Sequence, residues 1–147
     1  MKSYVCATLS AMKEITIFTD GGARGNPGPA GIGLVIYDDK DNEMSSVSEA
    51  IGTATNNVAE YKAVVRALEH VATIVDDTKA VKITLKLDSQ LVERQLNGAY
   101  KVKDAGMKEL HSQAKELIEQ YAAVEFIHVK RELNKVADKL VNQALDA

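Results

Sequence analysis

The sequence predicts one α/β domain built on a mixed five-stranded sheet with helices on both faces. Three observations lead to this fold class. The chain has 147 residues, which is the length of one ordinary domain. Its first third holds three β-prone runs joined by short turns, as in antiparallel strands. The rest alternates amphipathic helical periods with β-prone runs, so right-handed crossovers should make the later strands parallel to the first.

The first three strands are expected to form an antiparallel meander. Ile15, Ile17 and Phe18 are apolar and β-prone, and the breaker-rich segment Asn26-Pro27-Gly28-Pro29 separates this run from the next. The predicted strands cover 14–19, 31–37 and 43–51, with a glycine-rich turn over 21–29 and a hairpin loop over 38–42.

The remaining elements follow from periodicity. Apolar residues at three- and four-residue spacing predict a helix from Val58 to Val75, with Asn57 as N-cap and Glu60 completing a capping box. Strict alternation from Val81 to Leu87 predicts the fourth strand. Further helices are expected over 89–96, 107–121 and 133–145, and a fifth strand over 124–129.

The ends and composition of the chain limit its class. Residues 1–12 are expected to be a flexible extension and residues 13–147 the domain, because the regular pattern begins at Lys13. The single cysteine, Cys6, excludes a disulfide framework and a thiolate zinc site, and indicates a reducing, cytoplasmic setting. No apolar run approaches the roughly 20 residues that span a bilayer, so no membrane partner is expected. We expect a monomer.

Charge alone does not decide the partner. The net charge of −3 argues mildly against nucleic-acid binding. Basic residues nevertheless gather in the last third, where each could be a solvated surface residue or all together could flank a phosphate backbone. They are Lys101, Lys103, Lys108, Lys130, Arg131, Lys135 and Lys139.

Four carboxylates at the ends of predicted elements are the strongest chemical signal. Read singly, Asp20 could cap a turn, Asp88 could cap a helix, Glu60 could complete its capping box and Asp138 could be a solvated helix acid. Parallel strands, however, bring Asp20 and Asp88 to one edge of the sheet, where α/β folds place ligands. Converging carboxylates need a cation between them, and a two-metal site needs several oxygen ligands from different elements.

Other chemistries fit less well. The chain has no dinucleotide fingerprint, no nucleoside-triphosphate loop and no G-x-S-x-G elbow. The histidines lack zinc-like spacing: His70 and His111 are expected on helix surfaces, and His128 packed on the fifth strand.

Four segments closely resemble the motifs of type 1 ribonuclease H, in that family's order. The first, FTDGGARGNPGPAG at 18–31, is highly specific, and the others are TNNVAE at 55–60, LDSQ at 87–90 and RELNKVAD at 131–138. The resemblance covers residues 15 to about 146 and agrees with the predicted element order. It implies the ribonuclease H-like fold and an RNA/DNA hybrid as substrate.

The resemblance also implies site roles. Asp20, Glu60, Asp88 and Asp138 would hold two Mg²⁺ or Mn²⁺ ions around the scissile phosphate of the RNA strand. Asp20 would bridge both ions, Glu60 and Asp88 would share one with the attacking water, and Asp138 would hold the other, giving 5′-phosphate and 3′-hydroxyl ends. Substrate contacts are implied for Gly21, Gly22, Asn26, Thr55, Asn56, Asn57 and Gln90, with Glu60 and the backbone near Gly21 contacting the 2′-hydroxyls.

Two departures from the family pattern concern the surroundings of this site. The tryptophan-bearing basic protrusion is missing, and Tyr100, Lys101 and Lys103 are expected to replace it in part, with a weaker grip on the DNA strand. The usual mobile histidine before the last acid is also missing. Arg131 is the expected auxiliary catalytic residue, as in shorter members of the family with arginine there.

Two rivals remain at this point. Exonucleases of the superfamily usually carry Asp-x-Glu in the first strand, whereas this chain has Asp20-Gly21-Gly22. A hybrid-binding module without catalysis would be expected to lose at least one of the four acids, and none is lost. The sequence therefore favours an endonuclease.

Overall fold

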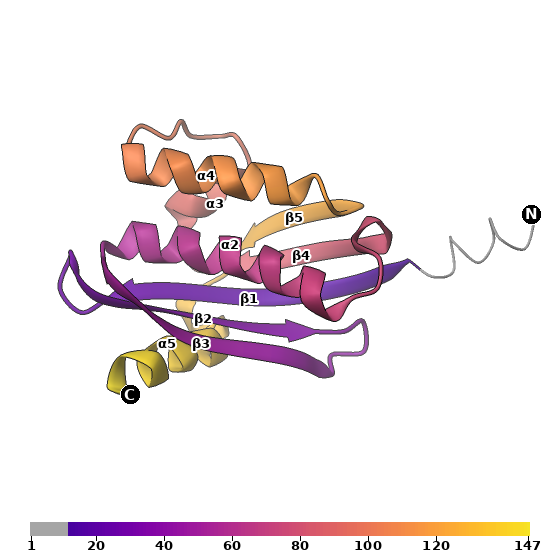
Figure 1. Ribbon diagram of the computed structural model, residues 1–147, viewed down its shortest axis with the longest axis horizontal. Helices are drawn as coiled ribbons and strands as arrows, with labels where there is room; N and C mark the ends of the chain where they lie inside the picture. The colour runs from indigo at the N-terminus through magenta and orange to yellow at the C-terminus, as the bar shows by residue number, and fades with distance from the viewer. Residues whose placement is uncertain (1–11) are drawn as a thin grey trace, which may run out of the picture.

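A five-stranded sheet forms the centre of the computed structural model, which describes residues 12–147 (Figure 1). The strand order is β3-β2-β1-β4-β5. β1 pairs antiparallel with β2, as β2 does with β3, whereas β1 with β4 and β4 with β5 are parallel. This confirms the predicted mixed sheet. The strands are β1 (Lys13–Ala23), β2 (Gly28–Tyr37), β3 (Glu43–Ala54), β4 (Val81–Leu87) and β5 (Ala123–His128).

Helices cover both faces of the sheet, as predicted. In Figure 1, α2 (Asn56–Ile74), α3 (Gln90–Leu96) and α4 (Ala105–Ile118) lie on one side, and α5 (Lys135–Asp146) lies on the other, against β2 and β3. Two short 3₁₀ turns, η1 (Thr78–Ala80) and η2 (Arg131–Leu133), precede β4 and α5. Among the described residues, no helix combines the length and the apolar character needed to cross a bilayer.

The main core lies between α2 and the sheet. Ile17, Leu34, Leu68 and Leu85 are fully buried there, and each such side chain contributes about 1.5–3 kcal/mol of hydrophobic stabilisation. The alternation that predicted β4 is confirmed, because every second residue from Val81 to Leu87 is buried. The core therefore fixes β1, β4 and α2 relative to one another.

The first turn is shorter than the sequence suggested. β1 continues to Ala23 and β2 begins at Gly28, because residues 21–23 keep pairing with residues 30–32. The parallel pairing of β1 with β4 ends earlier, at Thr19 opposite Leu87. Asp20 is therefore inside a strand, at the point where the sheet opens between β1 and β4.

The predicted helix cap at Asn57 is wrong. Thr55 is the N-cap of α2, and its Oγ1 accepts a hydrogen bond from Val58 N at 3.2 Å. Glu60 takes no part in a capping box, since its Oε1 accepts from the Gly21 backbone N–H. Ser89, not Asp88, caps α3 and accepts from Val92 N at 3.2 Å. Neither Glu60 nor Asp88 is needed as a cap.

Smaller corrections concern the last third of the chain. α4 ends at Ile118 rather than at Tyr121, although Tyr121 is buried and its hydroxyl donates to the Leu68 carbonyl. His128 is exposed at the end of β5, not packed as expected. The flexible extension expected over 1–12 falls, apart from Met12, outside the described residues.

Candidate active site

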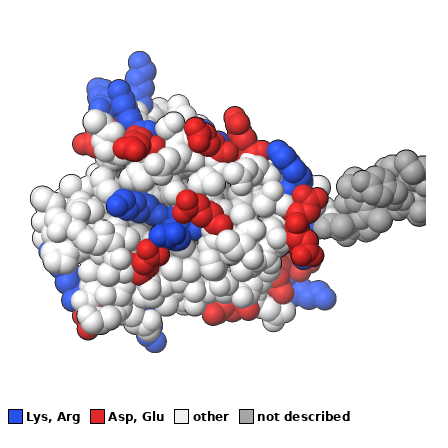
Figure 2. All heavy atoms as spheres, in the orientation of Figure 1, with Lys and Arg blue, Asp and Glu red and all other residues white. Residues whose placement is uncertain are grey.

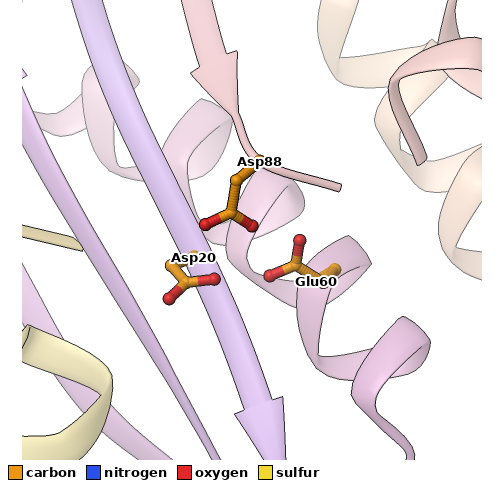
Figure 3. A group of neighbouring side chains, drawn as sticks. All are labelled: Asp20, Glu60 and Asp88. Carbon is orange, nitrogen blue, oxygen red and sulfur yellow. The ribbon is translucent and has the colours of Figure 1, made fainter. Parts of the chain in front are cut away.

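Asp20, Glu60 and Asp88 converge at the opening between β1 and β4 (Figure 3). One oxygen of each carboxylate lies within 4.8 Å of one oxygen of the other two. Asp20 is 8% exposed and Glu60 7%, while Asp88 is half-buried in the loop after β4. Residues that are far apart in the chain thus form one acidic cluster.

A glycine allows this convergence. A Cβ at Gly21 would overlap the backbone of Ala59, so only glycine lets β1 approach the first turn of α2 this closely. The Gly21 N–H donates to Glu60 Oε1 at 2.5 Å, which turns the Glu60 carboxylate toward the strand. Asp20 directly precedes Gly21 on β1, and Asp88 is the first residue after β4, the parallel neighbour of β1.

The cluster is electrostatically strained in the absence of a cation. Burial is the largest cause that raises the pKa of Asp20, to about 7, and the charges of Asp88 and Asp138 raise it further, while a hydrogen bond with Glu60 acts in the opposite direction. Burial, and then the charge of Asp20, raise the pKa of Glu60 well above its usual value. A cation between these groups would favour their ionised forms.

Asp138 lies on the same cleft but outside the group of three. It is exposed in the first turn of α5 and lines the hollow that holds the other acids. Its charge contributes to the raised pKa of Asp20. The structure therefore brings all four predicted acids to one cleft, with Asp138 at its outer side.

The cleft has a volume of about 430 Å³ and is lined by five of the eleven other predicted site residues. Gly21, Gly22, Asn56, Asn57 and Arg131 line it, together with the unpredicted Ala23, Arg24, Ser89, Val141, Asn142 and Leu145.

Three further residues that were predicted to contact the substrate lie behind or beside the cleft. Asn26 Oδ1 accepts from the Asn56 N–H at 3.0 Å, and Asn56 Oδ1 accepts from the Ala23 N–H at 2.8 Å, so these two amides shape the cleft wall. Thr55 is occupied as the helix cap. Gln90 is exposed at the start of α3 and is not among the residues that line the cleft.

Tyr100 and Lys101 line a separate hollow of about 350 Å³ between the linker after α3 and helix α4. Tyr100 is 51% exposed. Lys103 is exposed on the same linker, and Lys108 and Lys115 line the hollow from α4. Figure 2 shows basic side chains gathered at the upper left, where Figure 1 places this linker and the start of α4.

Sequence reasoning missed Asn134 as a site residue. Asn134 is only 1% exposed, and its Nδ2 donates to Asp88 Oδ2 at 3.3 Å and to the Thr19 carbonyl at 2.9 Å. The available signal was its place in the last motif, one turn before Asp138. Spacing alone could not show that its amide reaches across to Asp88.

The donor set fits a divalent metal ion. All of the clustered groups are carboxylates, the hard oxygen ligands that Mg²⁺, Mn²⁺ and Ca²⁺ prefer. Buried like charges at this separation are costly unless a cation compensates them. The described cluster contains no histidine or cysteine, which would favour zinc.

Known proteins are similar to this chain in sequence and in fold. Residues 18–144 match the family described as Reverse transcriptase-like. Ribonuclease HI of Halobacterium salinarum is 41% identical over 133 residues, which are 90% of this chain and 65% of that protein. A bifunctional protein of Mycobacterium tuberculosis is 38% identical over 135 residues, 91% of this chain and 36% of that protein. The chain thus spans between one third and two thirds of the length of these curated relatives.

Solved structures agree over almost the whole chain. LC11-RNase H1, isolated from compost by a metagenomic approach, superimposes with a TM-score of 0.87 at 47% identity, covering 92% of this chain and 97% of that one. RNase H1 from Halobacterium salinarum gives a TM-score of 0.85 at 40% identity, covering 90% and 98%. Fold and site thus define a ribonuclease H-like protein. Within that class, the chain belongs to the type 1 ribonuclease H family.

Proposed function

We propose that the protein is an endonuclease that hydrolyses the RNA strand of RNA/DNA hybrids, leaving 5′-phosphate and 3′-hydroxyl ends. The observation that carries this proposal is the convergence of Asp20, Glu60 and Asp88, with Asp138 on the same cleft. A related protein supports the substrate, because LC11-RNase H1, 46% identical, was solved in complex with an RNA/DNA hybrid.

Two Mg²⁺ or Mn²⁺ ions complete the proposed site. Asp20 would serve both ions, Glu60 and Asp88 one of them, and Asp138 the other. Such ions, when bound, supply Lewis-acid activation of the attacking water and stabilise charge on the departing 3′ oxygen. The central place of Asp20 is supported by its electrostatic contact with all three other acids.

The other residues of the cleft would hold the substrate. Glu60 and the backbone at Gly21 are joined by a hydrogen bond and would read the 2′-hydroxyl, which distinguishes RNA from DNA. Gly22, Asn56 and Asn57 line the cleft and would contact sugars, phosphates and minor-groove edges. We assign the same role to Asn26, Thr55 and Gln90, which lie behind or beside them.

The basic linker would bind the DNA strand. Tyr100 is exposed and can stack on a base or sugar, while Lys101 and Lys103 can meet phosphates. This short linker replaces a larger protrusion, so its grip on the hybrid should be weak. Arg131, at the rim near Asp138, would assist proton transfer or product release.

One chain supplies all four acids, which supports action as a monomer. Location in the cytoplasm stays part of the proposal, on the strength of the single cysteine.

The decisive experiment is cleavage of a hybrid labelled on its RNA strand, with Mg²⁺ or Mn²⁺ added or withheld. We expect metal-dependent cleavage with 5′-phosphate products and no cleavage of the matching DNA duplex. Asp20→Asn keeps the side-chain shape but removes the charge, so it should abolish cleavage while the circular dichroism spectrum is retained. The proposal fails if the intact protein does not cleave or if the variant cleaves normally.

A further inference from the structure

Asn134 lies where three of the four acid-bearing elements meet. It precedes α5, which carries Asp138, and it contacts both β1 and the loop after β4. At 1% exposure it is more deeply buried than Asp20 or Glu60. Its position alone would allow a purely structural role.

The hydrogen bonds of Asn134 indicate more than a structural role. Nδ2 donates to the carbonyl of Thr19, the residue before Asp20, at 2.9 Å. The same Nδ2 donates to Asp88 Oδ2 at 3.3 Å, and the Asn134 carbonyl accepts from Asp138 N at 3.1 Å. One residue thus links the segments that carry Asp20, Asp88 and Asp138.

The orientation of the Asn134 amide is energetically unfavourable, and a role as helix N-cap does not explain it. An asparagine N-cap normally accepts a backbone N–H of the first helical turn through Oδ1. Asn134 makes no such bond, and its Oδ1 is buried without a partner among the described residues. A buried acceptor without a partner is unfavourable, so the bonds of Nδ2 must outweigh it.

Asp88 is the acid that most needs such a contact. It is half-buried in a loop and is held within 4.8 Å of two buried carboxylates that repel it. The Asn134 amide donates to Oδ2, one of the two oxygens of the Asp88 carboxylate. A carboxylate at position 134 could not replace the amide, because its oxygen would face two other acceptors, the Thr19 carbonyl and Asp88 Oδ2.

We propose that Asn134 is a positioning residue that holds Asp88 in the metal-binding arrangement before any ion is bound. This inference rests on the proposed metal site. Loss of a residue that orients a metal ligand typically weakens metal affinity by about 10- to 100-fold.

The test is calorimetric titration of the full chain with Mn²⁺ in the absence of substrate, alongside unfolding in urea. We expect Asn134→Ala to weaken Mn²⁺ binding by at least about tenfold. Serine is a strong N-cap residue but is too short to reach Asp88, so Asn134→Ser should keep the fold and still lose affinity. High Mn²⁺ should restore the hybrid-cleavage rate of both variants.

Asn97→Ala is the matched control. Asn97 also ties two elements through its Nδ2, which donates to Glu93 and to the Phe126 carbonyl, but it contacts none of the four acids. This variant should lose stability and keep its Mn²⁺ affinity. In an Asp88→Asn background, Asn134→Ser should have no further effect on binding.

The outcomes separate the two proposals. If Asn134→Ser binds Mn²⁺ as tightly as the unmodified protein does, Asn134 is purely structural and this inference is overturned. If the unmodified protein itself binds no Mn²⁺, the metal site and this inference fall together.

Discussion

Asp20 combines burial with the charges of neighbouring carboxylates. It is buried on β1 next to the first turn of α2, and it interacts with three other carboxylates. Burial, and then the charges of Asp88 and Asp138, raise its pKa to about 7 from 3.8, although a hydrogen bond with Glu60 acts in the opposite direction. At neutral pH without metal, therefore, a substantial fraction of Asp20 is protonated. A proton and a metal ion would compete for the same oxygens.

The stability of the metal-free protein should therefore depend on pH through Asp20. A folded-state pKa above the unfolded value means that the folded state binds more protons, so stability falls as pH rises from about 4 to about 7. The slope from one such group approaches about 1.4 kcal/mol per pH unit. Asp20→Asn should flatten this slope and be the more stable form at pH 8, as measured by urea unfolding in chelator.

Two comparisons make this measurement specific. Added Mg²⁺ should remove most of the pH dependence of the unmodified protein, because the ion compensates the carboxylate charges. Identical slopes for the two proteins without metal would show that Asp20 does not titrate in this range.

Arg131 is the other residue whose role can be tested alone. It is exposed at the cleft rim in η2 and is no candidate metal ligand. We expect Arg131→Ala to lower the turnover number roughly tenfold. This is a smaller loss than the one caused by removing a buried donor that stabilises the transition state. The affinity for Mn²⁺ should not change. Arg131→Lys should keep part of the activity. Unchanged turnover of the alanine variant in steady-state hybrid cleavage would reject an auxiliary role.

At the scale of elements, close contact between α5 and β2 sets the position of Asp138. A Cβ at Gly33 would overlap the Ala137 carbonyl and crowd Val141 N, so the helix backbone lies directly on the strand. Asp138 follows Ala137 and is thereby held at the cleft. Ser48 of β3 adds a hydrogen bond from its Oγ to the Leu140 carbonyl at 2.6 Å.

Gly33→Ala should displace α5 and with it Asp138. The added methyl group meets backbone, which cannot yield easily, so we expect a loss of about 1–3 kcal/mol in the free energy of unfolding. The rate of hybrid cleavage should fall by more than the loss of folded protein accounts for. Gly31→Ala on the same strand is the control, because its Cβ would come no closer than 3.3 Å to α5. Equal effects of the two substitutions on unfolding and cleavage would contradict this account.

At the scale of the whole molecule, the four carboxylates of the cleft lie apart from the basic residues beside the linker before α4. The acidic cluster occupies the opening of the sheet, and basic side chains gather beside the linker that enters α4 (Figure 2). The net charge of −3 hides this separation. Metal ions would neutralise the acids, so the surface that meets a nucleic acid would be less negative than the net charge suggests.

This arrangement predicts the salt dependence of hybrid binding. Each phosphate contact contributes about 0.9 to the slope of log affinity against log salt. In an Asp20→Asn background that prevents cleavage, removing both Lys101 and Lys103 by alanine substitution should lower the slope by about 2 in fluorescence anisotropy. Lys82→Ala, at the exposed start of β4, should not change it. A slope unaffected by the double substitution would place the DNA strand elsewhere.

Most of the fold was predictable because its signals are local. Alternation identified β4, helical spacing identified α2, and the order of elements was enough to separate antiparallel from parallel pairs. Ends of elements were less predictable. β1 runs on through Gly21 and Gly22 because β2 offers hydrogen-bond partners, which outweighs the turn preference of glycine.

The sequence by itself determined the element order, the family motifs and the identities of the four acids, since all of these are recorded in residue types and spacings. Only the tertiary structure decided how the side chains are used. Glu60 turns to Gly21 instead of capping its own helix, Asp88 is held by Asn134, and Asp138 stays at the outer side of the cleft. The physical reason is that a hydrogen-bond partner is chosen by proximity in space, and proximity across 39 or 46 residues exists only after the core has packed.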